Sequence, residues 1–292
     1  MTDFDDAYFE RLEAARRHWW VQGMQEVAAA LVGETAPGLR VLDAGCGSGA
    51  MLPWLCAIAA PTPVTALDVA PPALERCRRL GLDVLLTLGS VVSLPYRDAS
   101  FDLVVSMDIL QHLPADGAAA AITAMRRVLR PGGRLLVRTN AAFGRSQVQE
   151  RDDWRLYRPE TLRAALTGAQ LEVEVLTPTN CVQALWASAP RPGRRSRSHH
   201  GGGPDTSHEG VGGPEWSVGG LGIPTPVGPV KNRVLLALLQ AEARWLARPG
   251  RRLPFGHSLY AVARRPPDDG RTAPTTRPPP VARTWPTGRP PR

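Results

Sequence analysis

The stretch 41-VLDAGCGSGA-50 decides how this sequence is interpreted. Residues 40–44 form a short, mainly apolar strand, and the glycines at 45, 47 and 49 form a turn before a helix predicted over about residues 50–60. In open α/β sheets a ligand lies against the backbone in such a turn, at the N-terminus of the following helix. The turn also satisfies G-x-G-x-x-[G/A], and Asp68 follows at the spacing of a dinucleotide-binding fingerprint. The sequence therefore predicts a ligand site here, and the neighbouring residues must identify the ligand.

An acid at the end of the strand, Asp43, disagrees with the dinucleotide interpretation. A dinucleotide places its pyrophosphate over the glycine turn, where a carboxylate would repel it. The same carboxylate would attract a ligand that presents a cation, such as the ammonium group of an amino acid. S-adenosylmethionine carries that group and has no phosphate, and glycine is still needed because a Cβ would collide with a ligand lying on the backbone. We therefore expect S-adenosylmethionine and not NAD.

The rest of the chain alternates strand-like and helix-like segments. Residues 5–32 are expected to form one or two helices, because apolar residues recur there at roughly helical spacing. The alternation that follows predicts βαβ units and a parallel sheet with helices on both faces, which is a doubly wound α/β fold. Strands are expected at 40–44, 63–68, 82–88, 101–107, 134–140, 171–180 and 258–265, and helices at about 50–60, 71–80, 118–130, 158–166 and 230–248.

The formal net charge of +8 is unevenly distributed. Residues 1–189 carry 18 arginines and 21 acids, a net charge of −3, whereas residues 190–292 carry 17 lysines and arginines and 6 acids, a net charge of +11. This basic C-terminal third would attract nucleic acid, but its arginines alternate with prolines and few aromatic residues, so it offers no stacking platform. A nucleic-acid partner is therefore not expected.

Composition also predicts the compartment. The four cysteines show no spacing typical of a metal site or a disulfide framework, so we expect free thiols and no metal. There is no run of about 18 apolar residues, and the acidic N-terminus lacks a hydrophobic signal region. We therefore expect no membrane span and a cytoplasmic location.

Four segments, in order along the chain, resemble one known family. VLDAGCGSG (41–49) is similar to the first motif of the class I S-adenosylmethionine-dependent methyltransferases, and VTALDV (64–69) is similar to their second strand. LPYRDASFDLVVSMDILQHL (94–113) and RVLRPGGRLLV (127–137) resemble the segments around their fourth and fifth strands. The chain thus resembles the bacterial, type 11-like members over most of residues 18–176 and again over 230–265. The resemblance implies a Rossmann-like sheet of seven strands, with the last strand antiparallel.

The resemblance and the composition together divide the chain. Residues 1–38 are expected to form an N-terminal helical lid, and residues 39–188 and 230–265 the methyltransferase domain. Residues 189–229 would be a flexible insertion before the last strand, because proline, glycine and arginine dominate them. Residues 266–292 would be a disordered basic tail for the same reason.

The resemblance also implies which residues hold the cofactor. Asp43 and the turn glycines would line its methionine part, Asp68 would bind the ribose hydroxyls, and Ser90 stands where the family commonly has an acid near the adenine. Related proteins carry arginines for the cofactor carboxylate where this chain has Gln22 and Met24, so another donor must hold that carboxylate. The expected cofactor-binding residues are Asp43, Gly45, Cys46, Gly47, Gly49, Asp68, Val69, Ser90, Val91 and Met107.

His112 is the candidate catalytic residue. It follows the fourth strand, where it could take a proton from an acceptor hydroxyl or amine, although related proteins also use this histidine for packing or for a cofactor contact. A sulfonium is already activated, so transfer needs mainly alignment, and a side-chain base is not obligatory. The expected function is methyl transfer from S-adenosylmethionine to O, N or C of a small molecule. Two alternatives stay open: an RNA or protein methyltransferase that uses the basic third, and a cofactor-binding protein without transferase activity.

Overall fold

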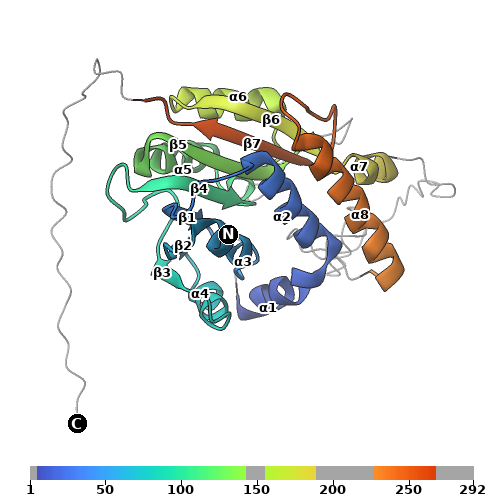
Figure 1. Cartoon of the computed structure of the whole chain (residues 1–292), viewed down its shortest axis with the longest axis horizontal. Coiled ribbons are helices and arrows are strands. Elements are labelled where there is room, and N and C mark those ends of the chain that lie inside the picture. Colours follow the sequence, from blue (N-terminus) through green and yellow to red (C-terminus); the bar gives the residue numbers. More distant parts are fainter. Residues whose placement is uncertain (1–4, 143–154, 189–226, 268–292) are drawn as a thin grey trace, which may run out of the picture.

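The computed structural model describes residues 5–142, 155–188 and 227–267 (Figure 1). Most of the predicted insertion (189–226) and of the predicted tail (268–292) lies outside these residues, as do residues 1–4 and 143–154. The described chain forms an open sheet with helices on both sides (Figure 1).

The sheet has the seven strands and the single antiparallel strand that were predicted. Its order is β3-β2-β1-β4-β5-β7-β6, and the five strands from β3 to β5 are parallel. β7 is antiparallel to both of its neighbours. The strands are β1 (Val41–Ala44), β2 (Val64–Asp68), β3 (Val84–Leu88), β4 (Phe101–Met107), β5 (Leu129–Asn140), β6 (Glu172–Thr179) and β7 (Ser258–Arg264). Because the strand order reverses between β1 and β4, their carboxyl ends flank the crevice in which such sheets bind ligands.

Two hydrophobic clusters lie on opposite faces of the sheet, as the strand period of two requires. In β4, Val104 belongs to the cluster that packs against α5 and α6, whereas Leu103 and Val105 belong to the cluster that packs against α2, α3 and α8. Both faces are therefore covered, which confirms the doubly wound architecture. The helices are α1 (Asp6–Ala14), α2 (Trp19–Val32), α3 (Leu52–Ala59), α4 (Pro71–Arg78), α5 (Ala115–Val128), α6 (Pro159–Gly168), α7 (Cys181–Ser188) and α8 (Pro229–Leu246), with short 3-10 turns η1 (Ala15–Arg17) and η2 (Leu110–His112).

Two boundaries differ from the prediction. The helix expected to run to residue 130 ends at Val128, and β5 begins at the next residue, so the Pro-Gly-Gly segment lies inside the strand assignment. Gly132 has a φ of 78°, which only glycine adopts readily, and it leads the chain from the helix into the sheet. α7 was not predicted from the sequence.

Helices α2 and α8, more than 190 residues apart in the chain, lie side by side in front of the sheet (Figure 1). Trp19 and Trp20 are both buried between them, with Leu235 and Leu239 of α8. A Cβ on Gly23 would overlap Leu239, so the two helices approach closely at this glycine. The N-terminal segment is thus fixed to the C-terminal part of the domain.

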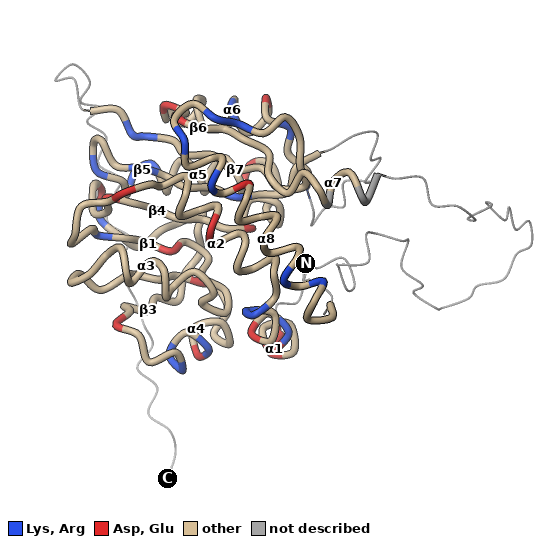
Figure 2. Tube along the Cα trace, turned by 45° about the vertical axis from the view of Figure 1, so that its right-hand side comes forward, with Lys and Arg blue, Asp and Glu red and all other residues tan. Residues whose placement is uncertain are grey.

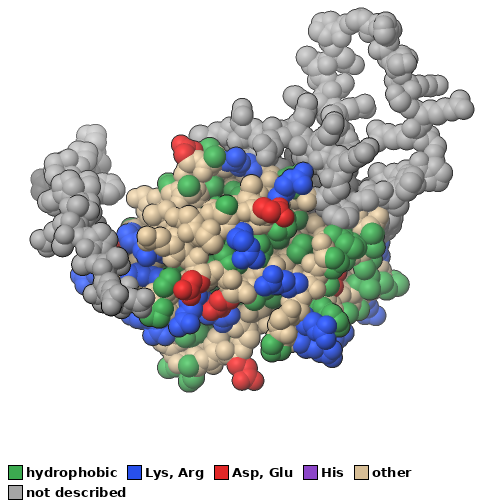
Figure 3. Space-filling view, turned by 90° about the horizontal axis from the view of Figure 1, so that it is seen from above, with side chains coloured by type: hydrophobic (Ala, Val, Ile, Leu, Met, Phe, Trp, Pro, Cys, Tyr) green, Lys and Arg blue, Asp and Glu red, His purple; other side chains and the backbone are tan. Residues whose placement is uncertain are grey.

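None of the helices in the described residues is long and apolar enough to cross a membrane. On the face seen in Figure 3, basic and acidic side chains are intermixed with apolar ones.

Candidate functional site

The glycine turn joins β1 to α3 at the carboxyl edge of the sheet. The amides of Gly45 and Cys46 both donate to the carbonyl of Leu67 in β2, at 2.8 and 3.0 Å. The φ angles of Gly45, Gly47 and Gly49 are 90°, 52° and 81°, a region that favours glycine. Backbone hydrogen bonds therefore fix the turn against the neighbouring strand.

The three glycines differ in what surrounds them. A Cβ on Gly45 would overlap the side chain of Ile109, and one on Gly49 would lie 3.0 Å from the sulfur of Cys77. No atom of the described residues lies within 4 Å of a Cβ built on Gly47. At Gly45 and Gly49 the missing Cβ thus makes room for side chains of the protein itself, and the expectation that all three glycines line the cofactor stays a prediction. Gly47 alone of the three faces open space.

Asp43 lies below this turn and is 1% exposed. Its Oδ2 atom is buried and has no hydrogen-bond partner among the described residues. Burial raises the pKa of Asp43 to about 7, and the nearby charge of Asp68 adds to the rise. A buried carboxylate without a partner is costly, so this position is expected to receive a donor from outside the described residues.

Asp68 ends β2 and binds the glycine turn. Its two carboxylate oxygens accept hydrogen bonds from the amides of Gly47 and Ala70, at 2.8 and 3.0 Å. Burial raises the pKa of Asp68, and these amide hydrogen bonds oppose the rise. Each carboxylate oxygen can accept a second hydrogen bond, so Asp68 can still bind a ligand hydroxyl.

The remaining expected cofactor residues lie along the same edge of the sheet. Val69 follows Asp68 and is 62% exposed, a high value for a large apolar side chain. Ser90 follows β3, and its hydroxyl accepts a 3.4 Å hydrogen bond from the amide of Val92. Val91 is buried in the hydrophobic cluster below α5, so its side chain belongs to the core. Met107, the last residue of β4, is partly buried.

Cys46 lies inside the turn and packs against α4. Its sulfur is 3.7 Å from the sulfur of Cys77, and both thiols are free, as predicted. The Cys77 thiol donates to the carbonyl of Gly47 at 3.4 Å. The hydrogen bond to Cys77 and burial raise the pKa of the Cys46 thiol, so Cys46 lies in the turn as a neutral group.

The first helix covers the glycine turn, and the sequence did not indicate how. Arg16 of η1 donates to the backbone carbonyl of Ser48 inside the turn. Arg76 of α4 is buried and forms ion pairs with Asp6 at 2.8 Å and with Glu13 at 3.4 Å. These contacts hold α1 beside α4, and both helices carry basic and acidic residues (Figure 2). An arginine of the N-terminal segment is therefore present at the turn, although not at the positions of Gln22 and Met24.

Beyond β4 the chain turns sharply at Asp108, which has a φ of 60°. Asp108 forms an ion pair with Arg138 of β5. Arg138 also donates to the hydroxyl of Ser258 at 2.8 Å and lies over the ring of Trp20, 4.7 Å from its centroid. The sequence did not indicate this ion pair, because Asp108 follows β4 and Arg138 lies in β5, 30 residues further along the chain.

His112 lies on η2, four residues after Asp108, and is partly buried. Its amide donates to the carbonyl of Ile109 at 3.0 Å. The neighbouring Gln111 is buried, and its Oε1 accepts hydrogen bonds from Thr139 and from the amide of Asn140, at 3.2 and 3.1 Å. The turn that carries His112 is thus fixed to the end of β5.

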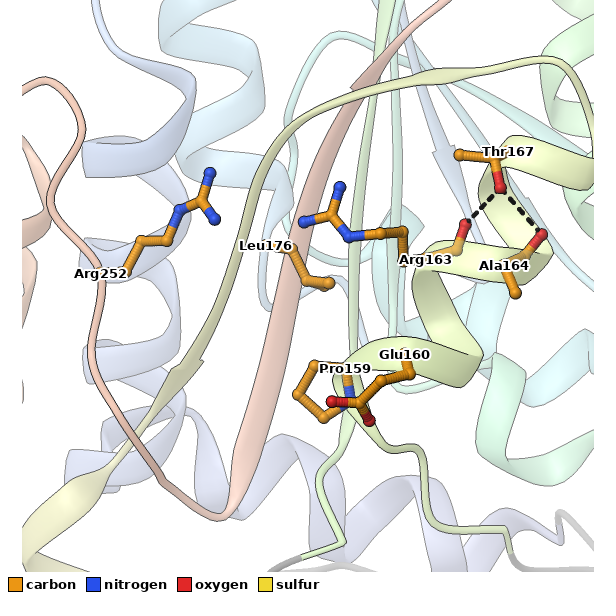
Figure 4. Close-up of a pocket in the computed structure, with 7 residues that line it drawn as sticks. All are labelled: Pro159, Glu160, Arg163, Ala164, Thr167, Leu176 and Arg252. Atoms are coloured by element: carbon orange, nitrogen blue, oxygen red, sulfur yellow. Dashed lines mark hydrogen bonds between the residues drawn. The ribbon is translucent and has the colours of Figure 1, made fainter.

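A cavity of about 500 Å³ lies elsewhere, beside α6 and the edge strand β6 (Figure 4). The side chains of Arg163 and Arg252 extend toward Leu176 from opposite sides (Figure 4). β7, β5 and β4 separate β6 from β1, so this cavity is not part of the glycine-turn site. Its lining residues are Pro159, Glu160, Arg163, Ala164, Thr167, Leu176 and Arg252.

Comparisons with known proteins agree with the geometry. Residues 42–137 match the family described as "Methyltransferase domain". The chain is 31% identical over 202 residues to the "Ubiquinone biosynthesis O-methyltransferase" of Xanthomonas oryzae pv. oryzae (strain PXO99A), a match that covers 59% of this chain and 83% of that protein. The protein of the same name from Xanthomonas campestris pv. campestris (strain B100) is 30% identical over 209 residues, with the same coverage.

Solved structures show the same fold at low sequence identity. The structure of the "[4+2]-Cyclase SpnF" is 19% identical, with a TM-score of 0.52 over 84% of this chain and 81% of that chain. A chain from the complex that contains the Haloferax volcanii Trm112 methyltransferase activator is 20% identical, with a TM-score of 0.57 over 89% of this chain and 95% of that chain. These likenesses concern the fold alone.

The fold and the turn define a Rossmann-like methyltransferase, and the chain belongs to the class I S-adenosylmethionine-dependent methyltransferases. It is therefore an enzyme whose cofactor is S-adenosylmethionine, as predicted from the sequence.

Proposed function

We propose that this enzyme methylates a hydroxyl oxygen of a small molecule. The observation that carries the methyl-donor part of the proposal is the buried, partnerless Oδ2 of Asp43 beneath the glycine turn, because it fits an ammonium group and repels a pyrophosphate. The names of the relatives, which are O-methyltransferases, support oxygen as the accepting atom.

The residues at the carboxyl edge fit the cofactor. Asp43 would pair with its ammonium group, and the backbone at Gly47 would lie against it, since the space beside that glycine is open. Asp68 would accept hydrogen bonds from the ribose hydroxyls with the lone pairs that the two amides leave. Arg16, which reaches Ser48, would hold the carboxylate in place of the arginines missing at Gln22 and Met24. When bound, the cofactor supplies an activated methyl group.

The other expected residues would act through shape. The exposed side chain of Val69 would cover the adenine, with Ser90 and the backbone at Val91 on its other side. Gly45, Cys46 and Gly49 would hold the form of the turn, and Met107 would line the crevice where β4 ends. His112, at the end of η2, would be the base if the acceptor hydroxyl lies beside that turn.

The domain division of the sequence is kept in this proposal. Residues 1–38 act as a lid through the contacts of α1 with α4 and of Arg16 with the turn. The reaction needs no nucleic acid and takes place in the cytoplasm, both of which stay predictions from the sequence.

Calorimetry and a transfer assay test the proposal together. S-adenosylhomocysteine should bind to the purified full chain, and NADH should not. With methyl-labelled S-adenosylmethionine, label should pass to hydroxyl compounds such as catechol and 3,4-dihydroxybenzoate and not to total RNA or to an unrelated protein. Label in RNA would favour the nucleic-acid alternative. Tight binding without any transfer would favour a binding protein without transferase activity.

A further inference from the structure

The ion pair between Asp108 and Arg138 stands at the acceptor side of the crevice. Asp108 is the first residue after β4, and the next residue, Ile109, fills the space beside Gly45 of the glycine turn. β4 lies directly beside β1, with Val105 paired to Asp43. Asp108 is therefore next to the methionine end of the cofactor site, on the side that faces away from the ribose-binding β2.

The two members of the pair differ in exposure. The Arg138 side chain is 2% exposed, whereas the Asp108 side chain is 29% exposed, so part of it is open to solvent although its Oδ1 atom is buried. Arg138 is held from three sides, by Asp108, by the Ser258 hydroxyl and by the Trp20 ring. The buried guanidinium of Arg138 thus fixes the position of the Asp108 carboxylate, and this carboxylate is the part of the pair that a ligand can contact.

This ion pair adds little to the stability of the fold. The free energy lost when a cation and its partner leave water is about as large as the attraction between them, and apolar residues of similar volume would stabilise the protein as well. Asp108 also adopts a left-handed backbone conformation, which is uncommon in residues other than glycine. This conformation directs the chain at the end of β4, and together with the buried charge of Arg138 beside a ligand turn it indicates a functional group.

We infer that Asp108, positioned by Arg138, receives the acceptor hydroxyl and takes its proton during methyl transfer. This inference rests on the proposed O-methylation. The new O–C bond forms as the S–C bond breaks, and the electron pair of the broken bond goes to sulfur. The hydroxyl oxygen becomes strongly acidic as it gains the methyl group, so a carboxylate paired with an arginine is a sufficient base. Asp108 then carries the proton away.

The charge balance of the pair also selects the acceptor. Because Arg138 already neutralises Asp108, the acceptor side carries no net charge that would attract an ammonium group or repel a neutral one. Burial, together with the charge of Arg138, lowers the pKa of the neighbouring His257 to about 4, so His257 adds no charge at neutral pH. A neutral hydroxyl compound therefore fits better than a protonated amine.

The test separates chemistry from folding with paired substitutions. Asp108→Asn alone leaves Arg138 buried without a counter-charge and should lower the melting temperature. The double variant Asp108→Asn with Arg138→Gln removes both charges, and Asn tolerates the positive φ. We expect the double variant to regain much of the melting temperature and to bind S-adenosylhomocysteine like the wild type. Its kcat on catechol should stay about 10²- to 10⁴-fold below the wild type.

Asp102→Asn is the matched control, since Asp102 lies near the other end of β4 and pairs with Arg40 and Arg130. It should cost stability and leave kcat unchanged in the folded protein. A double variant that folds and turns over catechol like the wild type would overturn the role of Asp108, as would a loss of kcat in His112→Gln with none in the double variant. Weakened S-adenosylhomocysteine binding in the double variant would assign Asp108 to the cofactor instead. If the wild type methylates only amines or no acceptor at all, both this inference and the proposed O-methylation fail.

Discussion

Cofactor affinity should depend on pH through Asp43. In the cofactor-free protein, burial and the charge of Asp68 raise the pKa of Asp43 to about 7, so the group is largely protonated at pH 6. An ammonium group pairs with the ionised carboxylate, and binding below pH 7 must therefore release a proton. Affinity rises with pH up to about 7 and then levels off.

The size of the effect follows from the fraction of ionised Asp43. With a pKa of about 7, S-adenosylhomocysteine should bind about eightfold more weakly at pH 6 than at pH 7.5. Asp43→Asn removes the charge and keeps the shape. It should weaken binding by about 1.5 to 3 kcal/mol at pH 7.5, roughly ten- to hundredfold, and abolish the pH dependence.

Titration calorimetry in two buffers of different ionisation enthalpy measures both the affinity and the proton release. Asp102→Asn serves as the control, because Asp102 lies at the opposite end of the neighbouring strand, and it should retain the wild-type pH profile. Equal wild-type affinity at the two pH values, with no proton released, would refute the pairing of Asp43 with the ammonium group.

The free energy of unfolding of the cofactor-free protein should fall as the pH rises, whereas the cofactor affinity rises. The pKa of Asp43 rises from 3.8 to about 7 on folding, so the protonated group favours the folded state. This contribution is fully present below the unfolded-state pKa and is lost as the pH rises through about 7. The melting temperature of Asp43→Asn, relative to that of the wild type, should therefore increase between pH 4 and 7. If the difference between the two melting temperatures stays constant over this range, the raised pKa is contradicted.

Four further variants test the site and the tail. Asp68→Asn should weaken S-adenosylhomocysteine binding about ten- to hundredfold by calorimetry, because the carboxylate binds the turn and would also bind the ribose in the proposed site. Gly45→Ala should lower the melting temperature, since its Cβ overlaps Ile109. Gly47→Ala should weaken S-adenosylhomocysteine binding more than it lowers the melting temperature. Equal effects of the two variants in both assays would contradict the open space at Gly47. Deleting residues 268–292 should leave melting and catechol turnover unchanged, and a loss of turnover would show that the basic tail takes part in the reaction.

The sequence predicted the sheet because its signals are local. Each strand is a short apolar run between turn residues, and each helix shows its own periodicity, so neither depends on distant contacts. The same holds for the glycine turn and for Asp68, whose positions follow from the end of a strand. The cofactor could be predicted because Asp43 is adjacent to that turn in the sequence.

The parts that the sequence missed depend on tertiary contacts. Arg16, Arg76 and Arg138 look like any other arginine in a chain with a single lysine, so nothing local indicates that Arg76 and Arg138 are buried. The contacts of these arginines are set by the strand or helix that packs against each of them in the folded chain. The burial of Trp19 and Trp20 depends on a distant segment in the same way, because both pack against Leu235 and Leu239 of α8. α8 lies more than 200 residues further along the chain.

The two acids at the ends of β1 and β4 show how one edge of a sheet distinguishes two ligands. Asp43 is buried with a partnerless oxygen, so it stays an unsatisfied acceptor until a cation arrives. Asp108 is neutralised by Arg138 and partly exposed, so it can accept a hydrogen bond without attracting charge. In the proposed roles, a cationic group would gain most at the first acid and a neutral hydroxyl at the second. Adjacent strands would then hold the two reactants on opposite sides of the space between them, and this alignment is the main contribution that a methyl transfer requires from a protein.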